Sequence, residues 1–172
     1  MLFRSFGATV AWCFASMFPK YVRGLVMLNG FPPPKYHGFI RRLARTGFLR
    51  GLARKQVATK IYGPEALKLG FPDPGKAPAE IAALLNDPPP ARIEAILDIY
   101  LSGEEAAPPP DVPALVFFGE ADRVPLVDRR AGQRFGRTLG NGRFFQLPGA
   151  GHLPQVDKPS DVLRELRSFL KR

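Results

Sequence analysis

Three residues that lie far apart in the chain, Ser5, Asp122 and His152, have side chains suited to one piece of chemistry. His152 follows Gly149 and Gly151 on a loop, where the backbone can hold an imidazole at the tip. A histidine there is suited to proton transfer near neutral pH. A serine hydroxyl becomes a nucleophile when a base takes its proton, and a carboxylate that accepts the other ring N–H fixes the tautomer. These residue types therefore predict nucleophilic catalysis by serine, histidine and aspartate.

The residues around these candidates predict that they lie at one edge of a parallel sheet. Residues 114–118 form a continuous apolar run, typical of a strand buried on both faces, and Asp122 follows it. Residues 143–147 form a second strand pattern before His152, and Ser5 precedes a stretch with helical periodicity. Open α/β sheets place their sites at the carboxyl edge of the strands. We therefore expect the three side chains to meet there.

The order Ser5, Asp122, His152 is the order of the catalytic residues in α/β-hydrolases. With the segments around them, the chain resembles the C-terminal part of that superfamily, from the turn that carries the nucleophile onward. The matching segments are residues 5–12, 18–29, 119–125 and 148–152. The resemblance covers residues 2–30 and 112–171. It implies a partial α/β-hydrolase fold with about four parallel strands, flanking helices and a helical cap insertion.

The resemblance also implies a role for each residue. Ser5 would be the nucleophile, His152 the general base, and Asp122 the carboxylate that orients the imidazole. The backbone N–H of Phe6 would donate to the oxyanion of a tetrahedral intermediate, and one such donor typically lowers the barrier by about 3 kcal/mol. Taken singly, Ser5 could instead be a helix N-cap, Asp122 a turn residue and His152 a hydrogen-bonded loop residue.

The chain departs from the family pattern in two ways. The turn around the nucleophile normally reads Gly-x-Ser-x-Gly, but Phe3 stands at the first glycine position. Arg4 stands where histidine is frequent, and Gly7 keeps the second small position. We expect Phe3 to strain this turn.

The first half of the family's fold, with the loop that gives a second oxyanion donor, has no counterpart, so the chain is either a piece of a longer protein or a shortened relative. An uncovered sheet edge would favour self-association.

Length and composition predict one globular domain. The chain has 172 residues, of which 45% are hydrophobic, unlike a disordered chain. The single cysteine, Cys13, cannot form an internal disulfide, so we expect a reducing, cytoplasmic setting. The formal net charge of +10 is spread out without a nucleic-acid motif, and no stretch reaches the roughly 20 apolar residues of a membrane-spanning helix. Residues 1–18 could alternatively be a short signal peptide.

Two proline runs, at residues 32–34 and 108–110, frame a middle segment of different character. Proline restrains its own backbone and that of the preceding residue, so these runs are typical of hinges. The predicted division is a core of residues 1–30 and 112–172 and a helical insertion at 31–111. By resemblance, this insertion would be the cap or lid that covers the site and sets substrate choice.

The middle segment predicts helices with a basic surface. The expected helices lie over residues 38–54, 78–86 and 91–101. The first has an arginine-rich face and a break near Gly47. That face would be solvated, lie on an anionic membrane or receive an acidic substrate. Tyr62 and Tyr100 are candidate substrate contacts, and His37 is given no catalytic role.

After the strand at residues 114–118, the pattern predicts a helix over residues 126–139, the strand at 143–147 and a last helix over residues 160–170. Ser160 is expected to be the N-cap of the last helix. Its apolar side would consist of Val162, Leu163, Leu166, Phe169 and Leu170. We expect the helices to cover both faces of the sheet.

The combined pattern favours a serine hydrolase that cleaves carboxylic esters or similar acyl compounds through an acyl-enzyme. Its substrate would be a small molecule, and the reaction would need neither a cofactor nor a metal. A second interpretation is a non-catalytic or truncated half-fold that binds a partner. A third is an epoxide-hydrolase-like relative, because residues 10–12, 14–15 and 18–19 are similar to that branch. That branch has an aspartate at the nucleophile position, so Ser5 argues against it.

Overall fold

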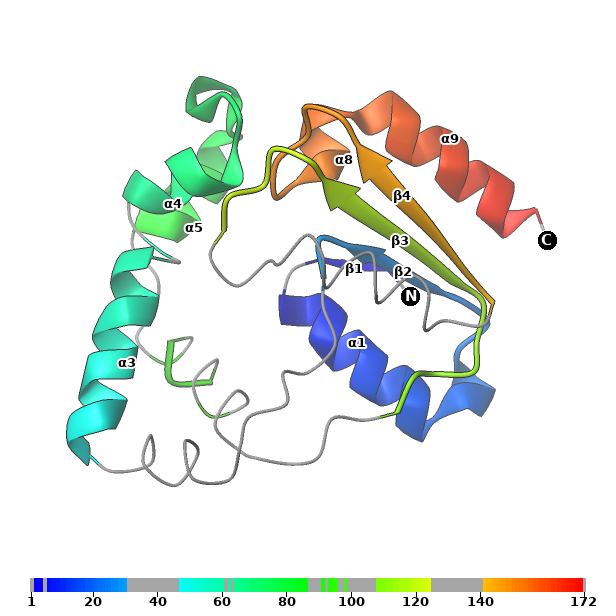
Figure 1. The fold of residues 1–172 in the computed structure, drawn as a ribbon, viewed down its shortest axis with the longest axis horizontal. Helices are drawn as coiled ribbons and strands as arrows, with labels where there is room; N and C mark the ends of the chain where they lie inside the picture. The colour runs from blue at the N-terminus through cyan, green and yellow to red at the C-terminus, as the bar shows by residue number, and fades with distance from the viewer. Residues whose placement is uncertain are drawn as a thin grey trace.

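The computed structural model describes residues 2–4, 6–30, 47–60, 62, 64–86, 91, 93–95, 98, 108–124 and 141–171. Figure 1 shows a sheet with helices on both of its faces and a further group of helices beside it. The strands are β1 (Leu2–Arg4), β2 (Leu25–Leu28), β3 (Ala114–Gly119) and β4 (Gly142–Leu147). They form one sheet in the order β1-β2-β3-β4, and each neighbouring pair is parallel. The predicted α/β class with four parallel strands is confirmed.

The register of the strands brings their carboxyl ends to one edge of the sheet. Arg4, the last residue of β1, is level with Leu28, which ends β2. Leu28 is level with Phe117 of β3, and Phe117 with Phe145 of β4. In Figure 1 the arrowheads of β3 and β4 point toward the helices of the middle segment. The loops that follow β2, β3 and β4 therefore leave the sheet close to one another.

The two faces of the sheet bury two separate apolar clusters, because successive side chains of a strand point to opposite faces. On one face α1 (Phe6–Met17) packs on β1 and β2, followed by the 3-10 helix η1 (Pro19–Tyr21). The buried cluster there comprises Ala8, Ala11, Trp12, Ala15, Val22, Leu25, Met27, Val112, Ala114, Val116 and Phe118. The cluster on the opposite face comprises Val26, Leu28, Leu115, Phe117, Leu147, Ala150 and Val162. The alanines of α1 have small side chains, which let this helix lie close against the sheet.

The second face is covered by the C-terminal helix α9 (Pro159–Leu170), which follows the short helix α8 (Pro154–Asp157). α9 begins at Pro159, and the prediction that Ser160 is its N-cap is wrong. The N-cap is Lys158, whose side chain makes no capping hydrogen bond. Proline at the first helical position has the φ angle of a helix already and needs no N–H partner, so it starts the helix in place of a serine cap.

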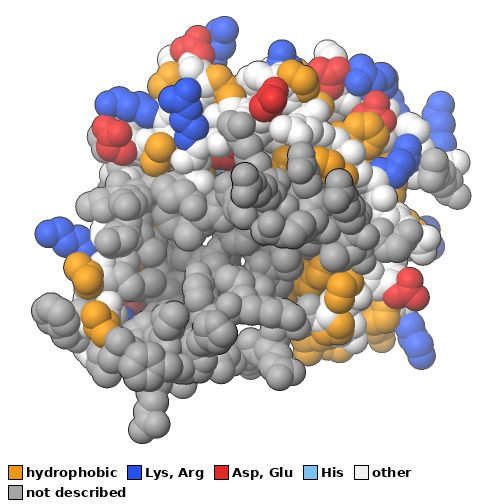
Figure 2. All heavy atoms as spheres, viewed as in Figure 1, with side chains coloured by type: hydrophobic (Ala, Val, Ile, Leu, Met, Phe, Trp, Pro, Cys, Tyr) orange, Lys and Arg blue, Asp and Glu red, His pale blue; other side chains and the backbone are white. Residues whose placement is uncertain are grey.

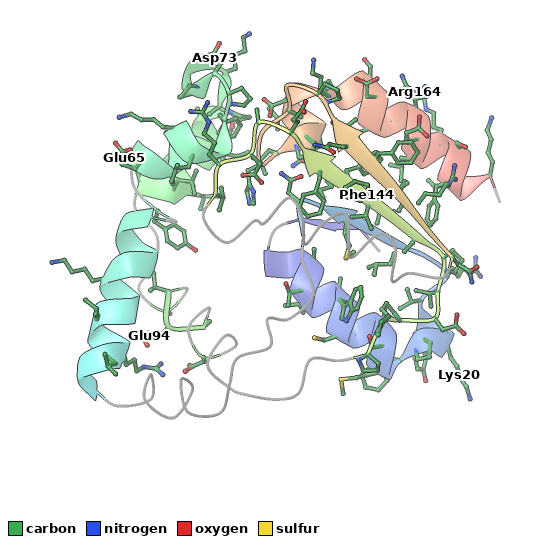
Figure 3. The ribbon with its side chains drawn as sticks, viewed as in Figure 1. Lys20, Glu65, Asp73, Glu94, Phe144 and Arg164 are labelled. Carbon is green, nitrogen blue, oxygen red and sulfur yellow. The ribbon has the colours of Figure 1, made fainter. Side chains whose placement is uncertain are left out.

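The apolar side of α9 is narrower than the sequence pattern predicted. Val162 is buried against the sheet, and Leu166 and Phe169 are partly buried beside it. These three positions are spaced as one face of a helix. Leu163 and Leu170 were expected on this side, but both are exposed. Figure 3 shows Arg164 on the outer side of α9, away from the sheet.

The middle segment contains α3 (Gly47–Lys60), α4 (Pro64–Gly70), the 3-10 helix η2 (Pro74–Lys76) and α5 (Ala79–Asn86). α5 agrees with the predicted helix, whereas α3 starts at the predicted break and extends beyond residue 54. α4 was not predicted, because seven residues are too few for a clear helical period. Residues 91, 93–95 and 98 are helical. Several predicted features lie outside the described residues: residues 38–46 of the first predicted helix, the rest of the one over 91–101, the helix over 126–139 and the first proline run.

Two arginines of α3 form ion pairs within the middle segment. Arg50 contacts Glu94 and Asp98, each at 2.8 Å, and Arg54 contacts Glu94 at 3.2 Å. Figure 3 shows Glu94 beside α3. Hydrogen bonds from Arg50 to Asp98 and to Glu94 raise the pKa of its guanidinium above the ordinary value. These arginines of the predicted basic face are therefore paired with carboxylates of the same chain.

The outer side of α1 and η1 carries exposed apolar side chains. They are Val10, Phe14, Met17, Phe18 and Tyr21. The rings of Phe14 and Phe18 contact each other, with centroids 5.2 Å apart. In Figure 2 hydrophobic side chains gather at the lower right, over this part of the molecule. β1, beneath α1, is an edge strand among the described strands.

Burial against the sheet predicts where truncation of a leucine will destabilise the chain. Leu25 is 0% exposed in β2, whereas Leu170 is 71% exposed at the end of α9. We expect Leu25→Ala to lower the free energy of unfolding by about 2–5 kcal/mol, because it leaves a cavity in a packed cluster. The control Leu170→Ala makes the same chemical change at the surface and should change it by less than about 0.5 kcal/mol. Urea denaturation measures both, and equal effects would contradict the packing described here.

Candidate active site

The structure brings two of the three sequence-predicted side chains into contact. Nδ1 of His152 lies 2.8 Å from Oδ2 of Asp122, which is a short hydrogen bond. The Asp122 side chain is 1% exposed and that of His152 is 13% exposed. With its proton on Nδ1, the ring donates to the carboxylate and presents Nε2 as the nitrogen that can accept a proton. This pair can therefore act as an oriented general base.

Asp122 is positioned by the turn that follows β3. The N–H of Val124 donates to Oδ1 of Asp122 at 2.9 Å, so each carboxylate oxygen has a partner. The N–H of Ala121 donates to the carbonyl of Ala150 at 2.8 Å, which ties the turn to the loop that carries the histidine. The carboxylate is thus fixed by local and non-local hydrogen bonds.

The loop that carries His152 is held by side chains as well as by main-chain contacts. The N–H of Gly151 donates to Oδ2 of Asp157, in α8, at 2.8 Å. The N–H of His152 donates to the carbonyl of Gly70, at the end of α4, at 2.6 Å. Gly149 has a φ of +69°, a left-handed conformation that favours glycine and makes the turn after β4. The imidazole therefore sits on a loop whose backbone is fixed from several sides.

Asn29, directly after β2, joins these pieces and was missed by the sequence analysis as a site residue. It is fully buried, and its Nδ2 donates to Oδ2 of Asp122 at 2.6 Å and to the carbonyl of Gly151 at 2.9 Å. Its Oδ1 accepts from the N–H of Gly119 at 2.8 Å. Its φ of +45° is one that asparagine adopts more readily than most residues. The sequence did contain one indication of this role. Asn29 has an amide side chain and directly follows an apolar strand, so it lies at the same edge of the sheet as the other candidate residues.

The other predicted site residues are placed as follows. Ser5 lies outside the described residues, between β1 and α1 in the sequence. Phe6 is the first residue of α1, and the first N–H groups of a helix have no partner within it. Tyr62, which lies between α3 and α4 in the sequence, is buried. Tyr100 and His37 lie outside the described residues.

Two features of the described part of the chain bear on other functions. It contains no group of three or more histidine, cysteine, aspartate and glutamate side chains arranged to hold a metal ion. Among the helices that the structure describes, none has the length and hydropathy needed to cross a membrane.

Comparison with known families identifies the class of protein that this fold and site define. The model of the alpha/beta hydrolase family matches residues 5–166. The chain belongs to this family, as the resemblance of its sequence to α/β-hydrolases predicted. No curated protein matches the chain in a sequence comparison.

Solved structures show the same fold at low sequence identity. A thermophilic esterase from Thermogutta terrifontis, solved with malate bound, has 21% identity and a TM-score of 0.72, over 99% of this chain and 63% of its own. Rv0554 from Mycobacterium tuberculosis has 19% identity and a TM-score of 0.68, over 99% and 64%. The protein DBJA has 19% identity and a TM-score of 0.65, over 99% and 67%. The chain thus spans about two thirds or less of these relatives and shares their fold.

The contacts of Asn29 predict that its side chain stabilises the site. Asn29→Gly tolerates the positive φ but leaves the N–H of Gly119 and the carbonyl of Gly151 without this partner. We expect a loss of about 1–3 kcal/mol in the free energy of unfolding. Asn29→Ala removes the same hydrogen bonds and adds left-handed strain, which costs about 1–2 kcal/mol more. Urea denaturation of both variants separates the two contributions, and an alanine variant as stable as the glycine variant would contradict the strained backbone.

Proposed function

We propose that this chain is a serine hydrolase that cleaves carboxylic esters or similar acyl compounds through an acyl-enzyme. Ser5 is the nucleophile, His152 the general base and Asp122 the residue that orients the imidazole. The observation that carries this proposal is the 2.8 Å hydrogen bond between His152 and the buried Asp122 at the carboxyl edge of the sheet. Family membership and the esterase fold among the solved structures support the reaction class.

The position of Ser5 in the sequence supports its role as nucleophile. It separates the last residue of β1 from the first residue of α1. β1 is parallel to β3 and β4 through β2, so its carboxyl end faces the same edge as the loops of Asp122 and His152. A turn between a strand and a helix at this edge is where α/β-hydrolases hold their serine. The predicted strain from Phe3 concerns this turn and stays a prediction.

The proposed reaction uses these residues in order. Nε2 of His152 takes the proton of the Ser5 hydroxyl as its oxygen bonds to the carbonyl carbon of the ester. The N–H of Phe6 donates to the resulting oxyanion. The intermediate then expels the alcohol, which takes the proton from His152, and leaves an acyl-serine. Water, activated by His152 in the same way, releases the acid and restores Ser5.

We also propose that residues 31–111 form a cap over a core of residues 1–30 and 112–172. The described helices α3, α4 and α5 lie beside the edge of the sheet that carries the pair (Figure 1). Such a cap would select a small acyl substrate by its lining residues, with Tyr62 and Tyr100 as candidates. The reaction as written uses no cofactor and no metal.

One observation favours a second candidate function, a half-fold that binds a partner. The outer side of α1 and η1 exposes five large apolar side chains, and β1 lies at the sheet edge among the described strands. Exposed apolar patches and free strand edges mark interaction surfaces. In that case the hydrogen bond between Asp122 and His152 would be structural, and a fluorophosphonate probe would not label Ser5.

A fluorophosphonate probe tests the nucleophile directly, because it forms a stable bond only with an activated serine. We expect labelling of the folded chain on Ser5, found by mass spectrometry of tryptic peptides. The Ser5→Ala variant is the matched control and should not be labelled. An unlabelled wild-type chain with a cooperative unfolding transition would remove the esterase proposal and favour the partner-binding function.

The role of the carboxylate predicts the effect of Asp122→Asn. This change keeps the shape of the side chain but favours the wrong tautomer of His152. We expect turnover of p-nitrophenyl acetate to fall by about 10⁴-fold, as for a triad that loses its aspartate charge. His152→Ala should abolish turnover, because it removes the general base. A variant at either position with wild-type turnover would exclude the proposed mechanism.

A further inference from the structure

The carboxyl end of α4 contacts both loops that carry the pair. The carbonyl of Gly70 accepts from the N–H of His152 at 2.6 Å, and the carbonyl of Leu69 accepts from the N–H of Arg123 at 3.0 Å. Arg123 follows Asp122 directly. The last carbonyls of a helix have no partner within that helix. Here the loops of the site supply the donors, so a helix of the middle segment is joined by main-chain hydrogen bonds to His152 and to the residue that follows Asp122.

The contact is made between backbones that approach without side chains. A Cβ added at Gly151 would collide with the carbonyl oxygen of Gly70 and would lie 2.7 Å from Cδ of Pro72. On the other side of the loop, a Cβ added at Gly119 would collide with the carbonyl oxygens of Gly151 and Ala150. The end of β3, the histidine loop and the end of α4 therefore stack as three backbone layers. Such a stack transmits a displacement of α4 to the histidine loop, because no flexible side chain lies between them.

The end of α4 is itself fixed. The N–H of Phe71 donates to the carbonyl of Leu67 at 2.9 Å, which closes the last turn, and the Phe71 side chain is buried. α4 also packs against α3 and α5. The group that holds the histidine loop is therefore part of a packed unit.

We propose that the carboxyl end of α4 is a positioning element for His152 and Asp122, and that Gly151 is the positioning residue that permits this contact. The proposal rests on the proposed function and adds to it. A cap that only covers a site acts on substrate binding, whereas α4 fixes the backbone beside the base and beside its carboxylate. A displacement of about 1 Å in a catalytic group can lower a rate by about 10²-fold. The middle segment therefore sets the rate of the chemical step.

The same methyl group, added once at the contact and once away from it, tests the proposal. In Gly151→Ala the methyl collides with α4. We expect kcat for p-nitrophenyl acetate to fall by about 10²-fold while KM changes by less than about twofold, because the change affects an interaction of the chemical step. In the control Gly51→Ala the new Cβ, in α3 of the same middle segment, has no atom within 4 Å, so kcat should stay at the wild-type value.

Amide hydrogen exchange gives a readout that does not depend on activity. In the wild-type chain, the amides of His152 and Arg123 should exchange far more slowly than in an unstructured peptide, because Gly70 and Leu69 accept their hydrogen bonds. Both should exchange at least about tenfold faster in Gly151→Ala and at the wild-type rate in Gly51→Ala. NMR spectra of the labelled protein resolve each amide.

The outcomes separate this proposal from the proposed function. A wild-type chain that the fluorophosphonate does not label fails as a hydrolase, and amide exchange then still decides whether α4 holds the two loops. Wild-type kcat in Gly151→Ala, an equal loss of kcat in both variants, or unprotected amides in the wild-type chain would each overturn the proposal. If Gly151→Ala does not fold, the exchange of the wild-type amides decides it alone.

Discussion

The burial of the Asp122 carboxylate is the constraint on which the site depends. A buried carboxylate is costly unless hydrogen-bond donors surround it. Its two oxygens accept from Nδ2 of Asn29, from the N–H of Val124 and from the ring of His152. These donors follow β2, β3 and β4 in turn, so they converge only if the three strands keep their register. The parallel sheet is therefore what makes a charged group tolerable at this depth.

The same edge of the sheet depends on the absence of side chains at a few positions. Gly119 ends β3 where the histidine loop passes, and Gly151 faces α4. The main-chain groups brought together there are satisfied by one another or by Asn29 and Asp157. These are local demands on few residues. Because so few positions are constrained, the fold is compatible with sequence identities of only 19–21% to the solved structures that share it.

The fold was predictable from the sequence where a strong pattern met a clear boundary. β3 is a continuous apolar run, and Val162, Leu166 and Phe169 of α9 are spaced as one helix face. Both patterns reflect burial, which the order of apolar residues along the chain records. α4 was not predictable, since seven residues span only about two helical turns, too few for a clear apolar pattern, and its stability comes from packing. Asn29 was missed for a related reason. Its role depends on partners at positions 119, 122 and 151, which only the register of the strands brings within reach.

The strength of catalysis that this site can supply follows from its donors. Within this chain, the N–H of Phe6 is the one oxyanion donor that the proposed mechanism assigns. Each such donor typically contributes about 10²–10³-fold in kcat. A site with one donor and an intact histidine–aspartate pair would still activate its serine, because nucleophile activation and oxyanion stabilisation are separate steps. Serine labelling therefore tests the pair itself, whereas the size of kcat also reports how many donors surround the oxyanion.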